Sequence, residues 1–399
     1  MRDVATSSRL TAIDAVRGLV MVIMALDHVR DFIHNGAMVA SPTNLATTTP
    51  LLFFTRWITH VCAPAFALTA GLGAYLWWRR GNHSRGELSR FLLTRGLWLL
   101  VLELVVMRLL YNFDLAQSYP FLLLVLWALG LSMIVLAALI WVPVPALAGL
   151  AVAVMLGHNL LDRIPATTFG AAAPLWNLLH QPGVFTLGGK VMIVGYPLIP
   201  WVAVMALGFC LGALYQWEPA VRRRALARAG VAMIVGFVVL RAINAYGDPF
   251  PWSAQPSGGY TILSFLNTTK YPASLAFLLM TLGPTFLLLA WADGRAFSPA
   301  NPLVVFGRVP LFYYVVHFGA AHVVAALLAI IKYGGAAFGF IFHPVPSMGA
   351  PPGLYPEGFG YSLWVAYAVW IAIVVGLYPL CRWFAGVKAR RRDWWLAYL

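Results

Sequence analysis

Charged side chains are scarce in this chain, and their scarcity excludes most soluble folds. Asp, Glu, Lys and Arg make up 10% of its 399 residues, whereas hydrophobic residues make up 61%. A soluble globular protein carries roughly 25% charged residues, because water must hydrate its surface. The composition therefore predicts a protein that is surrounded by lipid. Sixteen Trp and sixteen Tyr are enough to form aromatic belts at both membrane interfaces.

Cysteine is rare as well, which excludes a disulfide framework and a cysteine zinc site. Cys62, Cys210 and Cys381 all lie in apolar stretches without paired spacing, so we expect buried, inert thiols. Motifs of metalloproteases, serine hydrolases and nucleotide-binding loops are also missing. We expect no metal. No small-residue cleavage site follows the N-terminus, so we expect the first helix to be retained.

The net charge of +14 does not indicate a nucleic-acid partner. The basic residues do not form one soluble face, but gather between long apolar runs. Cytoplasmic loops of membrane proteins show this pattern. We therefore expect the lipid bilayer, and not a nucleic acid, as the partner.

Apolar runs of membrane-spanning length recur along the whole chain. A hydrocarbon core about 30 Å thick requires roughly 20 apolar residues in a helix. The chain is therefore predicted to be an all-α integral membrane protein, a polytopic bundle of about ten transmembrane helices. We assign one transmembrane domain to residues 1–399. The predicted spans are 10–33, 50–78, 91–110, 119–140, 143–161, 190–216, 224–245, 271–292, 303–331 and 361–384.

The basic residues also give the bundle a direction. If both termini are cytoplasmic, the inside segments hold eighteen of the 27 Lys and Arg residues, as the positive-inside rule requires. The opposite loops, 34–49, 162–189, 246–270 and 333–360, contain almost none. These are the longest loops, and long loops in compact proteins often carry function.

The first span carries a stripe of polar side chains on one face. Its members recur at intervals of three and four residues, which places them on one seam of a helix. They are Asp14, Arg17, Met21, Met24, His28 and Asp31. Charges inside a membrane are costly and often mark function. Asp14 and Arg17 are predicted either to bind substrate or to form a structural ion pair, whereas His28 is a candidate base that Asp27 or Asp31 could orient.

The second span adds Arg56 and His60, four residues apart and therefore on one helix face. Pro64 is predicted to bend the helix nearby. His60 is either a second catalytic imidazole or a histidine bonded to a backbone carbonyl that the proline frees. Arg56 is a candidate for substrate binding.

The later spans supply further candidates. Asn267 and Lys270 precede the eighth span and could bind the acceptor, although an outer lysine can also extend to lipid phosphate. In the ninth span, Tyr313 and His317 share a helix face and could be catalytic, with Tyr314 binding substrate; a structural Tyr–His contact is the alternative. The sixth span contains Pro197 and Pro200 and is predicted to be broken there.

The stretch from Arg9 to Gly18 resembles the opening of the transmembrane acyltransferase superfamily. The nearest branch is the heparan-α-glucosaminide N-acetyltransferase catalytic-domain family with its bacterial members. Three further stretches resemble those members: 196–201 with Gly208-Phe209, 267–272, and 310–317. The resemblance extends from about residue 9 to 385. A related branch places a histidine, taken as catalytic, after an Arg and ten residues, as in Arg17 and His28.

This resemblance implies transfer of an acyl group from cytosolic acyl-coenzyme A to an acceptor on the outer face. Acetyl-coenzyme A is the expected donor and a sugar or glycan the expected acceptor, in the bacterial inner membrane. Arg79, Arg80 and Arg308 are candidates for the coenzyme phosphates. Lys270 or Tyr313 could stabilise the oxyanion. A homodimer is left open. The alternative is a proton-coupled transporter or exporter, because intramembrane Asp, Arg and His also build proton relays.

Overall fold

Each of the ten predicted spans contains helix. The computed structural model describes residues 2–113, 119–350, 353–391 and 393–398. The α-helices are α1 (Arg2–Ile33), α2 (Pro50–Ile58), α3 (Cys62–Arg80), α4 (Arg85–Val101), α5 (Arg108–Asn112), α6 (Val125–Leu139), α7 (Val144–Gly157), α8 (Ala173–Leu179), α9 (Leu198–Leu211), α10 (Pro219–Ile243), α11 (Gly258–Leu266), α12 (Leu275–Ala292), α13 (Pro302–Arg308), α14 (Pro310–Tyr333) and α15 (Leu363–Arg390). The helical prediction is confirmed.

Within the described ranges, seven helical stretches are long and apolar enough to cross a membrane. The helix α1 is not among them, because charged residues are spread along it. The helices α4 and α6 are shorter, at 17 and 15 residues. The chain is therefore an all-α polytopic membrane protein.

Of three short strands, two replace the first residues of predicted spans, and the third lies in the predicted loop 162–189. Strand β3 (Lys190–Val194) lies between β1 (Phe121–Leu123), which is parallel to it, and β2 (Gly183–Leu187), which is antiparallel. Gly188 and Gly189 form the β2–β3 turn with φ of 56° and 73°. Glycine adopts such angles readily in a two-residue hairpin. The predicted starts at residues 119 and 190 were thus too early.

The prolines of the sixth span begin a helix and do not break one. Pro197 is the residue that precedes α9, and Pro200 lies in its first turn. Backbone N–H groups in a first turn have no partner within the helix, so proline costs little there. The predicted break was wrong, since α9 continues to Leu211.

Two other predicted spans do change direction. In the second span, a 3₁₀ turn at Thr59–Val61 separates α2 from α3, close to Pro64 as predicted. The predicted ninth span consists of two helices, because α13 ends at Arg308 and Pro310 begins α14.

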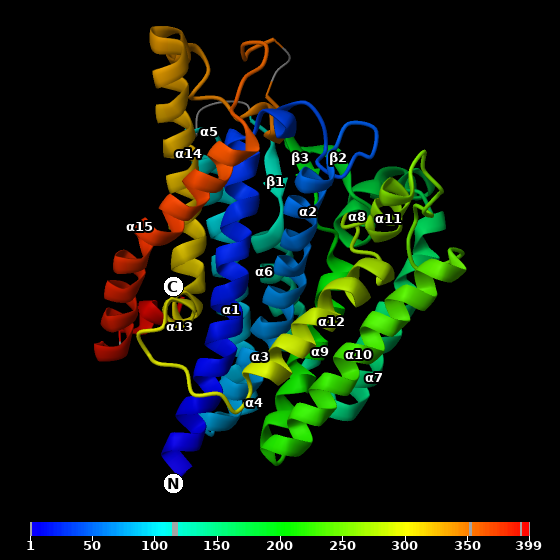
Figure 1. Ribbon diagram of the computed structural model, residues 1–399. Helices are drawn as coiled ribbons and strands as arrows, with labels where there is room; N and C mark the ends of the chain where they lie inside the picture. The colour runs from blue at the N-terminus through cyan, green and yellow to red at the C-terminus, as the bar shows by residue number, and fades with distance from the viewer. Residues whose placement is uncertain (1, 114–118, 351–352, 392, 399) are drawn as a thin grey trace.

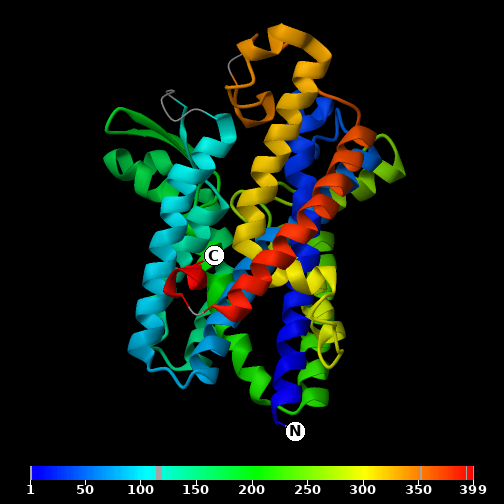
Figure 2. The ribbon, with the colours of Figure 1, turned by 90° about the vertical axis from the view of Figure 1, so that its left-hand side faces the viewer.

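Helix α1 lies at the centre of the bundle. It packs against α3, α12, α13, α14 and α15. Figures 1 and 2 show it running through the molecule, with α7 and α10 at one side and α14 and α15 at the other. Residues from both ends of α1 therefore face several other helices.

Two glycines bring α1 and α13 into backbone contact. A Cβ atom on Gly18 would lie 1.7 Å from the carbonyl oxygen of Leu303, and one on Gly307 would lie 1.8 Å from that of Asp14. No larger residue fits at either position without moving a backbone. This contact fixes Arg308 beside the start of the polar stripe.

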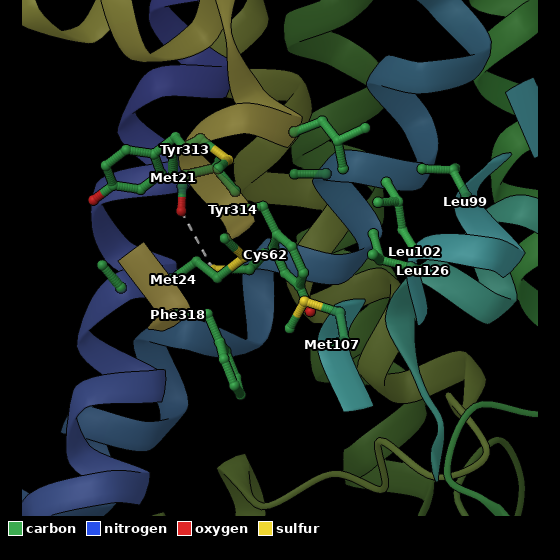
Figure 3. Packing of buried hydrophobic residues seen from close by; sticks show 14 of the residues in the cluster. Met21, Met24, Cys62, Leu99, Leu102, Met107, Leu126, Tyr313, Tyr314 and Phe318 are labelled. Atoms are coloured by element: carbon green, nitrogen blue, oxygen red, sulfur yellow. Dashed lines mark hydrogen bonds between the residues drawn. The ribbon is translucent and has the colours of Figure 1, made fainter. Parts of the chain in front are cut away.

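The largest hydrophobic core lies between α1, α3, α4, α6 and α14. Figure 3 shows Met21 and Met24 of α1 near Cys62, Tyr314 and Phe318. Cys62, Cys210 and Cys381 are all buried free thiols, as predicted.

The two ends of the bundle differ in composition. We call the end with the N-terminus and the turns at 81–84 and 217–218 the basic end, and the end with loops 34–49 and 334–361 the polar end (Figure 1). Arg392, one of the predicted cytoplasmic cations, lies outside the described residues.

Candidate functional site

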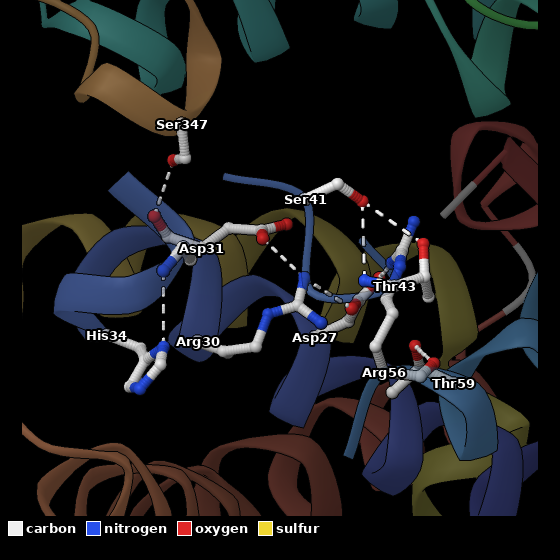
Figure 4. A network of polar contacts seen from close by, with 10 residues as sticks. Asp27, Arg30, Asp31, His34, Ser41, Thr43, Arg56, Thr59 and Ser347 are labelled. Atoms are coloured by element: carbon white, nitrogen blue, oxygen red, sulfur yellow. Dashed lines mark hydrogen bonds and ion pairs between the residues drawn. The ribbon is translucent and has the colours of Figure 1, made fainter. Parts of the chain in front are cut away.

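A network of ion pairs occupies the polar end of α1 (Figure 4). Asp27 pairs with Arg56 of α2 and, at 2.9 Å, with Arg30. Arg30 also pairs with Asp31. Arg30 is 1% exposed, and its Nε and Nη1 make no hydrogen bond within the described chain. The network therefore joins two acids to two arginines, and Arg30 was not among the predicted site residues.

His28 contacts another imidazole instead of an acid. Its Nδ1 lies 2.8 Å from Nε2 of His317 on α14. The predicted orienting groups, Asp27 and Asp31, are engaged with arginines. The other ring nitrogen of His317, Nδ1, lies 2.7 Å from the carbonyl oxygen of Tyr313. The prediction that Asp27 or Asp31 orients His28 was thus wrong.

This chain of contacts selects one tautomer for each neutral histidine. A carbonyl oxygen only accepts, so Nδ1 of His317 must carry its proton. Nε2 of His317 is then an acceptor, and Nδ1 of His28 donates to it. Nε2 of His28 is left without a proton, as a general base requires.

His322 shows what a structural histidine looks like on the same helix. Its Nδ1 lies 2.6 Å from the carbonyl oxygen of Leu110. Its ring stacks on Phe32 and Phe113. Like His317, it bonds to a backbone carbonyl oxygen, but it contacts no second imidazole within the described residues. A His322 variant is therefore a control for a His317 variant.

Tyr313 and Tyr314 face different surroundings. The hydroxyl of Tyr313 is buried without a hydrogen-bond partner within the described residues, and its ring stacks on His317. Tyr314 lies edge-on to His28 and lines a cavity. Tyr313 therefore holds His317 through its backbone carbonyl oxygen, and Tyr314 is the tyrosine that adjoins both His28 and the cavity.

His60 lies on a different side of α1 from His317. Its ring packs against Phe277 at 5.4 Å between centroids. Its Nδ1 is buried without a hydrogen-bond partner among the described residues, so that nitrogen does not form the predicted bond to a freed carbonyl. The structure therefore separates His60 from the His28–His317 pair.

Lys270 points toward the ion-pair network. Its Nζ lies 5.7 Å from the ring centroid of Tyr196 and 5.3 Å from that of Tyr271. Its charge is close enough to act on Asp27 and His28.

Asn267 has a structural role near the same loop. Its amide nitrogen donates to the carbonyl oxygen of Thr43 at 3.1 Å. Arg241 binds the carbonyl oxygens of Phe265, Ser264 and Asn267 at the end of α11. Asn267 thus fixes two outer loops together, and its predicted role in substrate binding has no support from this geometry.

His34 lies just beyond the end of α1, where two outer loops meet. Its Nδ1 accepts a hydrogen bond of 3.2 Å from the backbone N–H of Ala37. Burial lowers the pKa of His34, and the positive charge of Arg30 lowers it further. The neutral imidazole is therefore the form that the fold uses.

At the basic end, Asp14 lies between two arginines. It is 3.8 Å from both Arg17 and Arg308. Arg17 also donates to the carbonyl oxygen of Thr69 at 2.6 Å. The ion pairs are long, so the guanidinium of Arg17 is held mainly by α3.

Two adjoining cavities extend from the basic end to Tyr314, whose ring lies edge-on to His28. One, of about 330 Å³, is lined by Asp14, Arg17, Trp77 and Arg80 among others. The second, of about 290 Å³, shares Arg17 and Trp77 and continues to Tyr314. Its walls are mostly apolar. The arrangement fits a slim molecule with an anionic end at Arg17 and Arg80 and a reactive end near His28.

The basic residues differ in their access to these cavities. Arg95 of α4 lines the second cavity and was missed as a site residue, because its sequence context is an ordinary cytoplasmic charge. Arg79 instead lies 5.3 Å from the ring of Trp78. Arg222, another basic residue predicted to be cytoplasmic, forms a buried two-bond pair with Asp293.

Glu103 explains how one wall of the second cavity is held. It lies in the π-helical segment Leu102–Met107 and accepts hydrogen bonds from the backbone N–H groups of Leu126 and Trp127. A carboxylate at a helix N-terminus is favourable. Glu103 therefore fastens α6 beside the cavity.

A comparison with models of known protein families shows to which family the chain belongs. The model described as heparan-alpha-glucosaminide N-acetyltransferase, catalytic, matches residues 9–245, which is more than half of the chain. The chain belongs to this family. The match covers α1 to α10. It therefore includes the parts of the cavity walls that α1, α3, α4 and α6 form. A comparison with curated proteins found no match.

Family membership identifies the chain as a transmembrane N-acetyltransferase in general. Acetyl-coenzyme A is the donor that such acetyltransferases use. Among the residues that the structure describes, no group of three or more His, Cys, Asp or Glu could hold a metal ion.

Proposed function

We propose that this protein transfers an acetyl group from acetyl-coenzyme A, entering at the basic end, to a sugar acceptor at the polar end. The carrying observation is the His28–His317–Tyr313 chain, which leaves Nε2 of His28 unprotonated, in a ring that lies edge-on to Tyr314, and Tyr314 lines the second cavity. The basic end would face the cytoplasm. The bacterial inner membrane is the proposed location, with glycan modification as the cellular role.

The donor would bind along the two cavities. Arg17 and Arg80 at the basic end, with Arg95 beside them, would hold the phosphates of the coenzyme. The apolar walls would receive the pantetheine arm. Arg308 would support this site through Asp14, and Arg79 has no part in it.

The chemical step would be direct transfer. Nε2 of His28 takes the proton of an acceptor hydroxyl or amine as that oxygen or nitrogen bonds to the thioester carbon. The carbon–sulfur bond then breaks, and the coenzyme thiolate leaves and takes up a proton. The carboxylates of Asp27 and Asp31, next to the relay in α1, would stabilise the imidazolium that forms.

The decisive experiment measures coenzyme thiol release and product mass together, using purified protein in nanodiscs with a panel of amino sugars. His28→Gln should lower kcat by about 10²–10⁴-fold, the usual contribution of a general base. His180→Gln is the control, since His180 bonds Asp162 far along the chain in another cluster. Full transfer by the His28 variant would refute the assignment.

The same experiment separates a transporter from an enzyme. A transporter would move a labelled solute into proteoliposomes without releasing coenzyme thiol. The proposed acetyltransferase would release one thiol for each acetylated acceptor.

A further inference from the structure

Two lysines near the polar end have the same aromatic setting but different bonding. Lys332 of α14 lies 5.1 Å from the rings of both Tyr333 and Tyr361. Its Nζ donates to the carbonyl oxygen of Gly360 at 2.9 Å. Lys270 lies beside the rings of Tyr196 and Tyr271, which contact each other edge-on, yet within the described residues its ammonium makes no hydrogen bond or ion pair.

The loop that carries Lys270 is held firmly. Asp248 accepts hydrogen bonds from the backbone N–H and hydroxyl of Thr269 and from the hydroxyl of Ser274. The backbone N–H of Ser274 also bonds to the carbonyl oxygen of Thr269 at 3.0 Å. The turn that carries Lys270 is thus fixed, and Lys270 itself is half-buried.

The carboxylates around Lys270 are bonded to other groups. Asp27 and Asp31 pair with Arg30 and Arg56. Asp248 accepts hydrogen bonds from Thr269 and Ser274. Within the described residues, none of these carboxylates forms an ion pair with the ammonium of Lys270. Buried or half-buried charge is costly unless a counter-charge is present. A ligand anion would supply that counter-charge.

We infer that Lys270 forms an anion subsite and that the acceptor carries a carboxylate or phosphate group beside the amine or hydroxyl that is acylated. This inference rests on the proposed function. The anion would lie against the ammonium of Lys270, beside the rings of Tyr196 and Tyr271, with the nucleophile toward His28. A lipid headgroup phosphate is the other source of the same chemistry.

The first measurement is independent of turnover. The thermal unfolding midpoint is followed with glucosamine or glucosamine 6-phosphate, in nanodiscs and in lipid-free maltoside detergent. The phosphate ester should raise the midpoint of the wild type and of Lys332→Gln in both media, and should not raise that of Lys270→Gln. Stabilisation in detergent alone would assign the site to lipid phosphate and overturn the inference.

The second measurement compares acceptors during turnover. The ratio of kcat/KM for glucosamine 6-phosphate over glucosamine should be about tenfold or more, and should fall to about one in Lys270→Gln. Lys270→Arg should retain most of the preference and Lys332→Gln all of it. Equal use of both acceptors by the wild type would overturn the inference and leave the proposed function intact. Anion stabilisation without any turnover would support the subsite and count against the proposed function.

Discussion

The imidazoles of His28 and His317 lie 2.8 Å apart and join α1 to α14. The two residues are 289 positions apart in the chain, so only the fold brings them together. The backbone carbonyl of Tyr313 sets the direction of the whole chain of hydrogen bonds.

Removing His317 should weaken catalysis by His28, the proposed base, without abolishing it. In His317→Ala, kcat should fall by about 10–100-fold, as when a histidine loses its orienting partner, and the pH–rate profile should change because the tautomer of His28 is no longer selected. Thiol release measured from pH 5.5 to 9 tests this. His322→Ala removes a neighbouring backbone-bonded histidine and should keep both rate and profile. If the two variants behaved alike, the relay would have no catalytic role.

Arg17 should affect the donor more than the acceptor. Arg17→Met removes the guanidinium between the two cavities and should raise the KM for acetyl-coenzyme A by about tenfold or more. The KM for the acceptor should change little. Arg79→Met is the matched control, since Arg79 stacks on Trp78. An unchanged donor KM in Arg17→Met would place the coenzyme phosphates elsewhere.

The backbone contact between α1 and α13 should tolerate no side chain. Gly18→Ala would place a methyl group 1.7 Å from the carbonyl oxygen of Leu303 and should lower the stability by about 1–3 kcal/mol or more. Gly149→Ala on α7 meets nothing within 4 Å and should be neutral or slightly stabilising. Thermal unfolding in one detergent compares them. Equal unfolding midpoints would contradict the close packing.

His34 should make the polar end sensitive to acid. Its pKa is lowered in the folded state, so its contribution to stability is present above the unfolded value of about 6.5 and is lost as the pH falls through the folded pKa. His34→Asn keeps a side-chain acceptor but does not titrate. The unfolding midpoint of the wild type should therefore fall more than that of His34→Asn between pH 8 and pH 4. Parallel pH curves would contradict this role.

The sequence predicted the helices well because a bilayer demands long apolar runs. It also indicated His28 and His317 separately, each from its spacing on a helix. It could not pair them, because periodicity describes one helix face and not which helix lies opposite. The prolines of the sixth span misled for a similar reason. Proline breaks a helix interior but is accepted in a first turn, and the hairpin ending at Val194 moves that turn to residues 198–201.

The roles of the remaining site residues depend on contacts with other segments, which cannot be predicted from the sequence around each residue. Asn267 and Lys270 are three residues apart. Asn267 joins two loops by a hydrogen bond, whereas the charge of Lys270 acts on the ion-pair network. Arg79 and Arg80 are adjacent, but Arg80 lines the cavity beside Asp14, and Arg79 lines neither of the two cavities described above. Arg30 was overlooked beside Asp27 and Asp31 although it is the residue that joins them.

Helix α1 is continuous from Asp14 to Asp31, so the distance between two of its residues along the axis is set by the number of residues between them. Arg17 and His28 are eleven positions apart, which corresponds to about 16 Å along the axis at 1.5 Å per residue. Inserting a single residue between them would lengthen that interval by about 1.5 Å and rotate one end by about 100° relative to the other. In the proposed mode of binding, the number of residues between Arg17 and His28 thus sets the length that the donor must span.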